Sequence, residues 1–204
     1  MVKKQSNSFM SCDGKTSIHV VMWRPDENEY DKPVAVLQIS HGMIEYIDRY
    51  DGFARFMADR GFVVVGNDHL GHGESVCSDD DLGFFKDEHP GEALAKDVHH
   101  LTVLTKKMYP GIPYYLLGHS MGSFVTRKYI CDYGYELDGV IIMGTGHQPT
   151  PMVLAGKALA DITRFIKGDR YRSRLISKIM FGAYNKRIKN VRTSNDWLTR
   201  DETV

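Results

Sequence analysis

The chain has 204 residues, of which 42% are apolar and 25% are charged, as in an ordinary globular protein. Its 26 basic residues balance 26 acidic ones, so the overall charge does not point to a nucleic-acid partner. The first residues lack the apolar core of a secretory signal, and the apolar runs are too short to cross a bilayer. Cys12, Cys77 and Cys131 are widely spaced and form no CxxC pair, so the cysteines indicate neither a disulfide framework nor a zinc site. We therefore expect a cytoplasmic protein.

Short β-rich runs alternate with amphipathic runs over residues 1–148. In chain order, the apolar runs predict strands at 17–23, 34–40, 62–66, 114–117 and 140–143. Between them, apolar residues three and four positions apart predict helices at 50–60, 91–108 and 121–133. Strands that are apolar throughout are buried on both faces. This pattern is typical of an α/β protein whose mainly parallel sheet has helices on both faces.

The pattern changes after His147. No strand is predicted from residue 149 onward, and apolar residues from Met152 to Ile166 recur at helical spacing. Ten basic residues and one acid lie between Arg164 and Arg192. We expect a partial core at 1–148 and an α-helical lid at 149–204. The basic face of this lid suits contact with an anionic lipid headgroup or a membrane surface, although a solvated helix face explains the charge equally well.

A GxSxG motif spans Gly118, His119, Ser120, Met121 and Gly122. The apolar run PYYLL leads directly into it and the helical run MGSFVTRKYI leads out, which is the context of a nucleophile elbow. Glycines two positions before and after the serine leave room for the strand and the helix to approach closely. We predict that Ser120 is a catalytic nucleophile. The alternative is a serine in an ordinary strand-to-helix turn.

The run His41-Gly42-Met43 follows a predicted strand. A tight turn there can aim the Met43 backbone N–H at a substrate oxygen, and the Met121 N–H can supply a second donor. Such a pair would form an oxyanion hole, in which each donor contributes on the order of 3 kcal/mol. The alternative is a loop whose histidine only caps the strand.

A run of histidines, acids and glycines, Asp68 to Ser75, follows another predicted strand. Two histidines and two acids suggest a metal site, but the glycines interrupt any helix that would align His69 with His72. We favour a structural turn that supports the catalytic loops. Neither a metal ion nor a cofactor is expected.

Four segments resemble the monoacylglycerol lipase and lysophospholipase branch of the α/β-hydrolases, which overlaps the serine aminopeptidase-like hydrolases. They are HGMIEYIDRY, NDHLGHGES, LLGHSMGS and FGAYNKRIKNVRTSNDWLTRDE, the last of which is similar to the lid of bacterial members. The resemblance implies an α/β-hydrolase fold and hydrolysis of a carboxylic ester with a long acyl chain or a glycerolipid substrate, with Ser120 acylated and then freed by water.

The same resemblance suggests roles for the residues around Ser120. It gives the oxyanion N–H groups to Met43 and Met121 and makes Glu45 and Asp68 supports of the loop architecture. Supporting positions are also implied within the matching motifs at His41, Gly42, Gly118, His119 and Gly122. Tyr46 stands where the family commonly has a histidine.

The sequence differs from the family pattern in the catalytic acid and base. In this fold they follow the nucleophile in the order acid, then histidine, and only His147 follows Ser120. Asp138 and His147 lie nine residues apart around one predicted strand, which separates them by about 30 Å when extended. We therefore expect no triad acid or histidine in this chain, with His147 as the alternative base.

We read the sequence as a C-terminally truncated hydrolase, or a degenerate relative, that hydrolyses esters little by itself. Within the same fold, a peptidase or another acyl hydrolase is the rival function, because fold does not choose the substrate. A catalytically dead binding module is the rival outside enzymes.

Overall fold

The computed structural model describes residues 1–85, 89–182, 184–193 and 196, and the chain forms two compact units, Met1–His147 and Gln148–Val204. None of the helices in the described ranges has both the length and the apolar character needed to cross a membrane.

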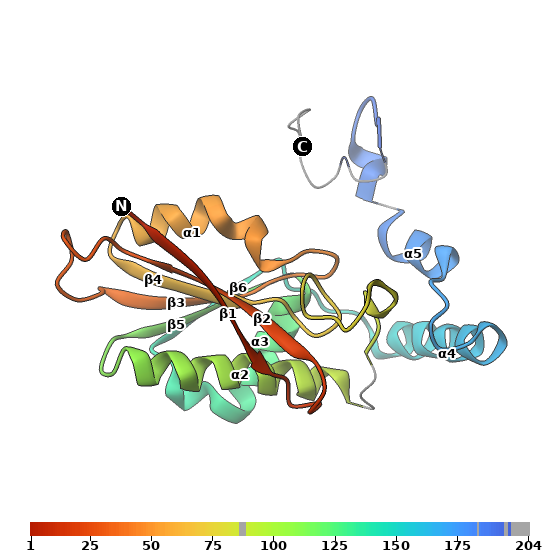
Figure 1. Cartoon of the computed structure of the whole chain (residues 1–204). Coiled ribbons are helices and arrows are strands. Elements are labelled where there is room, and N and C mark those ends of the chain that lie inside the picture. Colours follow the sequence, from red (N-terminus) through yellow and green to blue (C-terminus); the bar gives the residue numbers. More distant parts are fainter. Residues whose placement is uncertain (86–88, 183, 194–195, 197–204) are drawn as a thin grey trace. The chain divides into compact units, whose positions relative to one another are not determined.

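The first unit is built on a six-stranded sheet with the order β1-β2-β4-β3-β5-β6 (Figure 1). Its strands are β1 (Lys3–Met10), β2 (Ser17–Arg24), β3 (Ala35–Ser40), β4 (Phe62–Asn67), β5 (Tyr114–His119) and β6 (Gly139–Met143). Strands β4, β3, β5 and β6 are parallel, whereas β1 and β2 are antiparallel to their neighbours. The prediction of a mainly parallel α/β sheet is confirmed.

Helices cover both faces of this sheet. They are α1 (Asp51–Ala58), α2 (Pro90–Met108) and α3 (Met121–Tyr133), with short 3-10 turns η1 (Ile47–Tyr50), η2 (Asp79–Asp81) and η3 (Gly134–Glu136). Helix α1 lies on one face, and α2 and α3 lie on the other (Figure 1). Leu37 of β3 packs in the core cluster that includes Ala54 of α1, while the preceding Val36 packs with Leu101 of α2. This alternation explains why every residue of β3 is buried.

Strand β1 is absent from the prediction. Its sequence KKQSNSFM is polar and mostly exposed, so it lacks the apolar alternation that indicates a strand. It pairs with β2 along its whole length, from Lys3 opposite Arg24 to Met10 opposite Ser17. Its hydrogen bonds to β2, rather than its own composition, make this segment extended.

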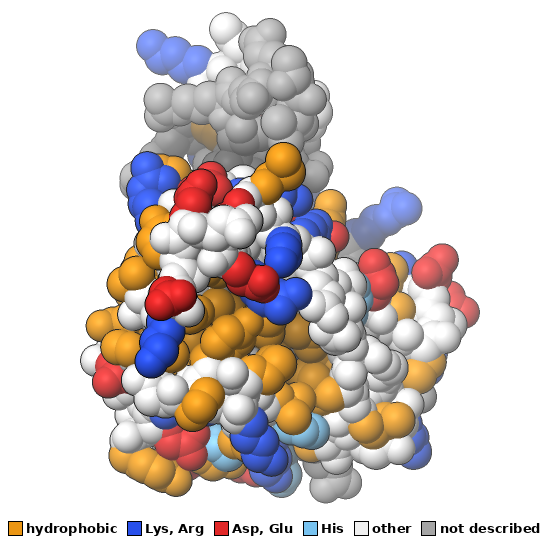
Figure 2. All heavy atoms as spheres, turned by 60° about the vertical axis from the view of Figure 1, so that its left-hand side comes forward, with side chains coloured by type: hydrophobic (Ala, Val, Ile, Leu, Met, Phe, Trp, Pro, Cys, Tyr) orange, Lys and Arg blue, Asp and Glu red, His pale blue; other side chains and the backbone are white. Residues whose placement is uncertain are grey.

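Apolar side chains remain at the surface. Strand β6 pairs only with β5 among the described strands, and Ile141, Ile142 and Met143 of β6 are exposed. Figure 2 shows one face of the molecule, on which hydrophobic side chains gather in a hollow between acidic and basic ones. Exposed apolar side chains that lie together in a patch often mark an interaction surface, whereas single exposed apolar residues are common on any protein.

The described residues of the second unit include two helices and no strand. It contains α4 (Thr150–Lys167), α5 (Arg174–Phe181) and the 3-10 turn η4 (Tyr184–Arg187). Ser173 precedes α5 and caps its start, because its Oγ accepts the Ile176 N–H. The segment at 181–202 that resembles a bacterial lid falls partly outside the described residues, at 183, 194–195 and 197–202.

Candidate active site

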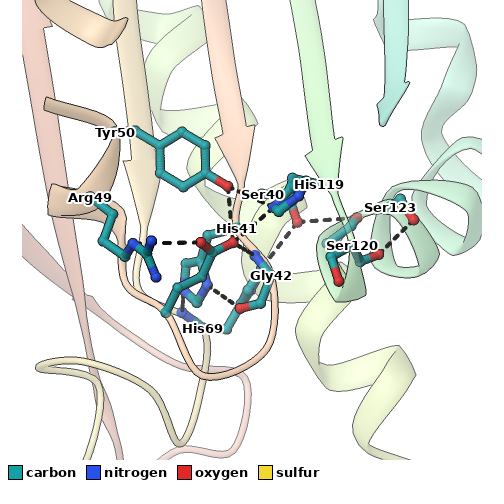
Figure 3. Close-up of polar contacts among 11 residues, drawn as sticks. Ser40, His41, Gly42, Arg49, Tyr50, His69, His119, Ser120 and Ser123 are labelled. Atoms are coloured by element: carbon teal, nitrogen blue, oxygen red, sulfur yellow. Dashed lines mark hydrogen bonds and ion pairs between the residues drawn. The ribbon is translucent and has the colours of Figure 1, made fainter. Parts of the chain in front are cut away.

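Ser120 lies in the turn between β5 and α3, with backbone angles φ 51° and ψ −116°. A positive φ is costly for a residue with a side chain, so the surrounding bonds must hold it in place. Its N–H donates to the Met143 carbonyl oxygen at 3.0 Å, and its own carbonyl oxygen accepts the Ser123 hydroxyl at 2.6 Å (Figure 3). The serine is thus held in a strained strand-to-helix turn, as its motif predicts.

Two glycines allow the helix and the strands to come together at this turn. A Cβ on Gly122 would overlap the carbonyl oxygen of Ser40 and lie 2.5 Å from that of His41. A Cβ on Gly118 would lie 2.6 Å from the Gly122 carbonyl oxygen. Only glycine lets the start of α3 approach the end of β3 so closely.

The loop of residues 41–44 lies beside the serine. A Cβ on Gly42 would be 3.1 Å from the Cβ of Ser120. The Met43 N–H has no hydrogen-bond acceptor among the described residues, and the Met121 N–H is the first of α3, where no helix carbonyl precedes it. Ile44 turns the loop sharply with φ 60°. Two unpaired backbone donors therefore belong to the segments next to Ser120.

His41 holds this loop from inside the protein. Its ring is fully buried, its Nδ1–H donates to the Gly42 carbonyl oxygen at 2.7 Å, and its Nε2 accepts the His69 N–H at 2.9 Å. Burial lowers the pKa of His41 to about 4. The ring is therefore neutral near pH 7, and its contacts assign the proton to Nδ1.

Asp68 connects two loops through its carboxylate. Its Oδ1 accepts the Ile47 N–H at 2.7 Å and its Oδ2 accepts the Glu74 N–H at 2.8 Å. A Cβ on Gly73 would overlap this carboxylate. Burial raises the pKa of Asp68, although both N–H bonds act in the opposite direction. The side chain has the contacts of a structural support.

The neighbouring histidines also make contacts within the protein. His69 Nε2 lies 3.0 Å from Ser40 Oγ, and His72 Nδ1 lies 3.2 Å from the Leu70 carbonyl oxygen. Burial lowers the pKa of both histidines. Over the described residues, no group of three or more His, Cys, Asp and Glu side chains is arranged to hold a metal ion.

Glu45 is the centre of a hydrogen-bond cluster that includes Gly42, Tyr50 and His119. Its Oε1 accepts the Gly42 N–H and the Tyr50 hydroxyl, the latter at 3.0 Å, and lies 3.0 Å from His119 Nδ1. Arg49 Nε is 4.0 Å from its second oxygen. Burial opposes the charge of Glu45, but the bonds from His119, Gly42 and Tyr50 outweigh it and lower its pKa.

The contribution of Tyr50 was not predicted from the sequence. It lies five positions after Glu45 and sixty-nine before His119, so no local pattern connects all three. Ser40 and Ser123, which contact the same loops, carry no recognisable signal either.

The residues considered as acid and base do not meet at Ser120. Asp138 accepts the Tyr114 N–H at 2.7 Å, which places it at the start of β5, the end opposite Ser120. His147 is exposed and makes no hydrogen bond or ion pair with any described residue. The Ser120 hydroxyl likewise has no hydrogen-bond partner among the described residues. A base for Ser120 is therefore not found in the part of the chain that the structure describes.

Comparison with known proteins places the chain in one family. The model of the family described as "Serine aminopeptidase, S33" matches residues 31–204. A monoglyceride lipase homolog of Monkeypox virus is 33% identical over 153 residues, which are 72% of this chain and 51% of that protein. The monoglyceride lipase of Mus musculus is 27% identical over 144 residues, which are 71% of this chain and 42% of that protein. The chain spans about half the length of the curated relatives it matches.

A solved structure gives the same result. The carboxyl esterase from Bacillus coagulans, determined in complex with glycerol, superposes with a TM-score of 0.81 and is 30% identical. The match covers 95% of this chain and 61% of that one. The chain therefore belongs to the serine aminopeptidase S33 family, in the monoacylglycerol lipase and lysophospholipase branch of the α/β-hydrolases.

Proposed function

We propose that this chain carries the nucleophile and the oxyanion donors of a serine hydrolase that cleaves carboxylic esters of lipid-like substrates, such as monoacylglycerols or lysophospholipids. The observation that carries the proposal is the positive φ of Ser120 in the turn between β5 and α3. A strained serine at this position presents its hydroxyl above the end of the sheet, where a carbonyl carbon can reach it.

The chemistry follows the two steps of acyl transfer. The Ser120 oxygen bonds to the ester carbonyl carbon, the bond from that carbon to the alcohol oxygen breaks, and the alcohol leaves with the proton of the Ser120 hydroxyl. Water then cleaves the acyl-enzyme, which releases the acid and returns a proton to the Ser120 oxygen. Negative charge develops on the carbonyl oxygen in both steps. The Met43 and Met121 N–H groups are the donors for that charge, and each is worth on the order of 3 kcal/mol in such a site.

The neighbouring residues have supporting roles in this proposal. His41 and Asp68 hold the loops on either side, and Glu45 accepts the Gly42 N–H next to the first oxyanion donor. Gly118 and Gly122 allow the close approach of β5 and α3, and His119 joins Glu45 to the nucleophile strand.

The lipid character of the substrate rests on two observations. The similar proteins from Monkeypox virus and mouse bear the name monoglyceride lipase or its homolog. In the second unit, Ile162, Phe165 and Ile166 of α4 are exposed apolar side chains, suited to contact an acyl chain. A preference for acyl esters over peptides is therefore part of the proposal.

Peripheral contact with an anionic membrane surface is a further part of it. Helix α4 carries exposed Phe165 and Ile166 next to Arg164 and Lys167, and this combination suits binding at a lipid interface. The chain should sediment together with vesicles of phosphatidylglycerol and phosphatidylcholine, and Phe165→Ser should lower the fraction of protein that sediments with them. Phe56→Ser on α1 is the matched control, since Phe56 is also exposed. Equal binding by all three proteins would reject this contact.

A fluorophosphonate probe tests the nucleophile directly. Labelling should disappear in Ser120→Ala and persist in Ser6→Ala, which removes an exposed serine of β1. Labelling that persists in Ser120→Ala would reject Ser120 as the reactive group. The substrate class is tested by comparing the rates at which a catalytically active protein containing this chain hydrolyses a monoacylglycerol, a lysophospholipid and an aminoacyl anilide. Faster cleavage of the anilide would reject the lipase assignment in favour of a peptidase.

A further inference from the structure

Glu45 connects the 41–44 loop to the strand that ends at the nucleophile. Its Oε1 accepts the Gly42 N–H, and His119 Nδ1 lies 3.0 Å from the same oxygen. His119 is the last residue of β5 and directly precedes Ser120. A single carboxylate oxygen therefore touches both the loop that contains Met43 and the strand that contains the neighbour of Ser120.

Tyr50 completes this cluster from the other side. Its hydroxyl donates to Glu45 Oε1 at 3.0 Å and lies 3.2 Å from His119 Nδ1 (Figure 3). The Glu45 side chain is only 11% exposed, so solvent competes little for its contacts. Hydrogen bonds to an ionised carboxylate are about twice as strong as those between neutral groups.

The backbone geometry shows where this cluster acts. A Cβ on Gly42 would lie 2.6 Å from Glu45 Oε1 and 3.1 Å from the Cβ of Ser120. Gly42 is thus enclosed between the carboxylate and the nucleophile. The Gly42 N–H is held by Glu45, and the next N–H along the chain is that of Met43. The Gly42 N–H belongs to the His41–Gly42 peptide, which Glu45 holds, whereas the Met43 N–H belongs to the Gly42–Met43 peptide, whose carbonyl oxygen accepts the His41 Nδ1–H. The two planes meet at the Gly42 Cα, so the direction of the Met43 N–H depends on Glu45 holding the first plane as well as on His41 holding the second.

We infer that Glu45 and His119 act together as positioning residues that set the Met43 N–H relative to Ser120. The inference rests on the proposed function, because this position matters only when charge develops on a substrate oxygen at Ser120. Neither side chain needs to contact the substrate. Their effect is transmitted through the His41–Gly42 peptide, next to the one that carries the Met43 N–H, and through the end of β5.

Amide hydrogen exchange measured by NMR on the whole chain tests the loop without any catalysis. In Glu45→Ala, exchange of the Gly42 amide should become faster by about tenfold or more, because its acceptor is lost. Glu45→Gln keeps an acceptor oxygen and should restore most of the protection. Glu29→Ala, which removes an exposed glutamate, is the control and should change nothing. Unchanged Gly42 exchange in a folded Glu45→Ala protein would overturn the inference.

His119→Ala provides a second variant in case Glu45→Ala does not fold. Loss of the ring should shift the Met43 amide resonance even though His119 is distant from Met43 in the sequence. A Met43 resonance identical to that of the unmodified chain would also overturn the inference.

Labelling kinetics with the fluorophosphonate probe test the coupling of the two residues. Each single alanine variant should lower the maximal labelling rate by about tenfold at an unchanged half-saturating probe concentration. The double variant should be labelled no more slowly than the slower of the two single variants, because either substitution alone already disrupts the Glu45–His119 contact. Additive losses would contradict a joint role. If the unmodified chain is not labelled at all, the proposed function fails, while Gly42 exchange still decides the inference.

Discussion

Gly122, at the start of α3, lies so close to the Ser40 carbonyl oxygen at the end of β3 that a Cβ on Gly122 would overlap it. This close approach brings the first turn of α3 to the loop that follows β3. The nucleophile turn and the 41–44 loop are therefore neighbours because position 122 has no side chain.

Gly122→Ala should destabilise the protein and displace the nucleophile turn. The new methyl group meets backbone atoms that cannot move aside, so we expect a loss of about 2–3 kcal/mol in the free energy of unfolding. Gly52→Ala is the matched control, because Gly52 is also the second residue of its helix and a Cβ there meets nothing within 4 Å. Denaturant unfolding measures both variants. Equal free energies of unfolding for Gly122→Ala and Gly52→Ala would show that the protein accommodates a methyl group at position 122 at little energetic cost.

Asp68→Ala should be destabilising because two backbone donors lose their acceptor. The Ile47 and Glu74 N–H groups both point to this carboxylate. Leaving buried donors unpaired costs about 1–3 kcal/mol each, so the total loss should exceed about 2 kcal/mol. Asp59→Ala, at an exposed position, should stay within about 0.5 kcal/mol of the unmodified chain. Thermal and denaturant unfolding of the three proteins provide the comparison, and similar values for both variants would argue against a supporting role of Asp68.

The stability of the protein should fall as the pH decreases from about 6.5 to about 5, because buried histidines must stay neutral in the folded state. Burial lowers the pKa of His41 to about 4, below the value for an unfolded chain. Between these two values the unfolded state binds more protons, so acid favours unfolding. The contribution of His41 is fully present above about pH 6.5 and is lost toward its folded pKa, by up to about 1.4 kcal/mol per pH unit.

His41→Gln isolates this contribution, since glutamine does not titrate. The variant should be less stable near pH 7, because the donor to the Gly42 carbonyl oxygen is lost. Its free energy of unfolding should also depend less steeply on pH in the same window. Denaturant titrations at several pH values measure both effects, and parallel pH profiles for the two proteins would contradict the assignment.

The 204-residue chain should hydrolyse a nitrophenyl ester only slowly, because no described residue acts as a base toward the Ser120 hydroxyl. A serine hydroxyl without a base is a weak nucleophile, and a site that keeps its oxyanion donors retains about 10³-fold catalysis over water. His147→Ala should leave this residual rate unchanged, whereas Ser120→Ala should abolish the part of the hydrolysis rate that proceeds through acylation of Ser120. A tenfold or larger drop in His147→Ala would instead identify His147 as the base.

The nucleophile turn could be predicted from the sequence because its determinants are adjacent along the chain. An apolar strand, glycines at 118 and 122 and an amphipathic helix follow one another directly, and each has a local physical requirement. The parallel sheet was predictable for a similar reason, since strands that are apolar on both faces must be covered on both faces. The position of Ser120 between β5 and α3 agrees with this reasoning.

Only the tertiary structure decided how the loops around Ser120 are held. Glu45 and His119 are 74 positions apart, and their contact exists because β3 and β5 are neighbours in the sheet. The polar strand β1 is extended only because it pairs with β2, and the pKa of His41 is lowered only because folding removes its ring from water. Pairing between distant strands and desolvation depend on the folded chain as a whole, and no local run of residues encodes them.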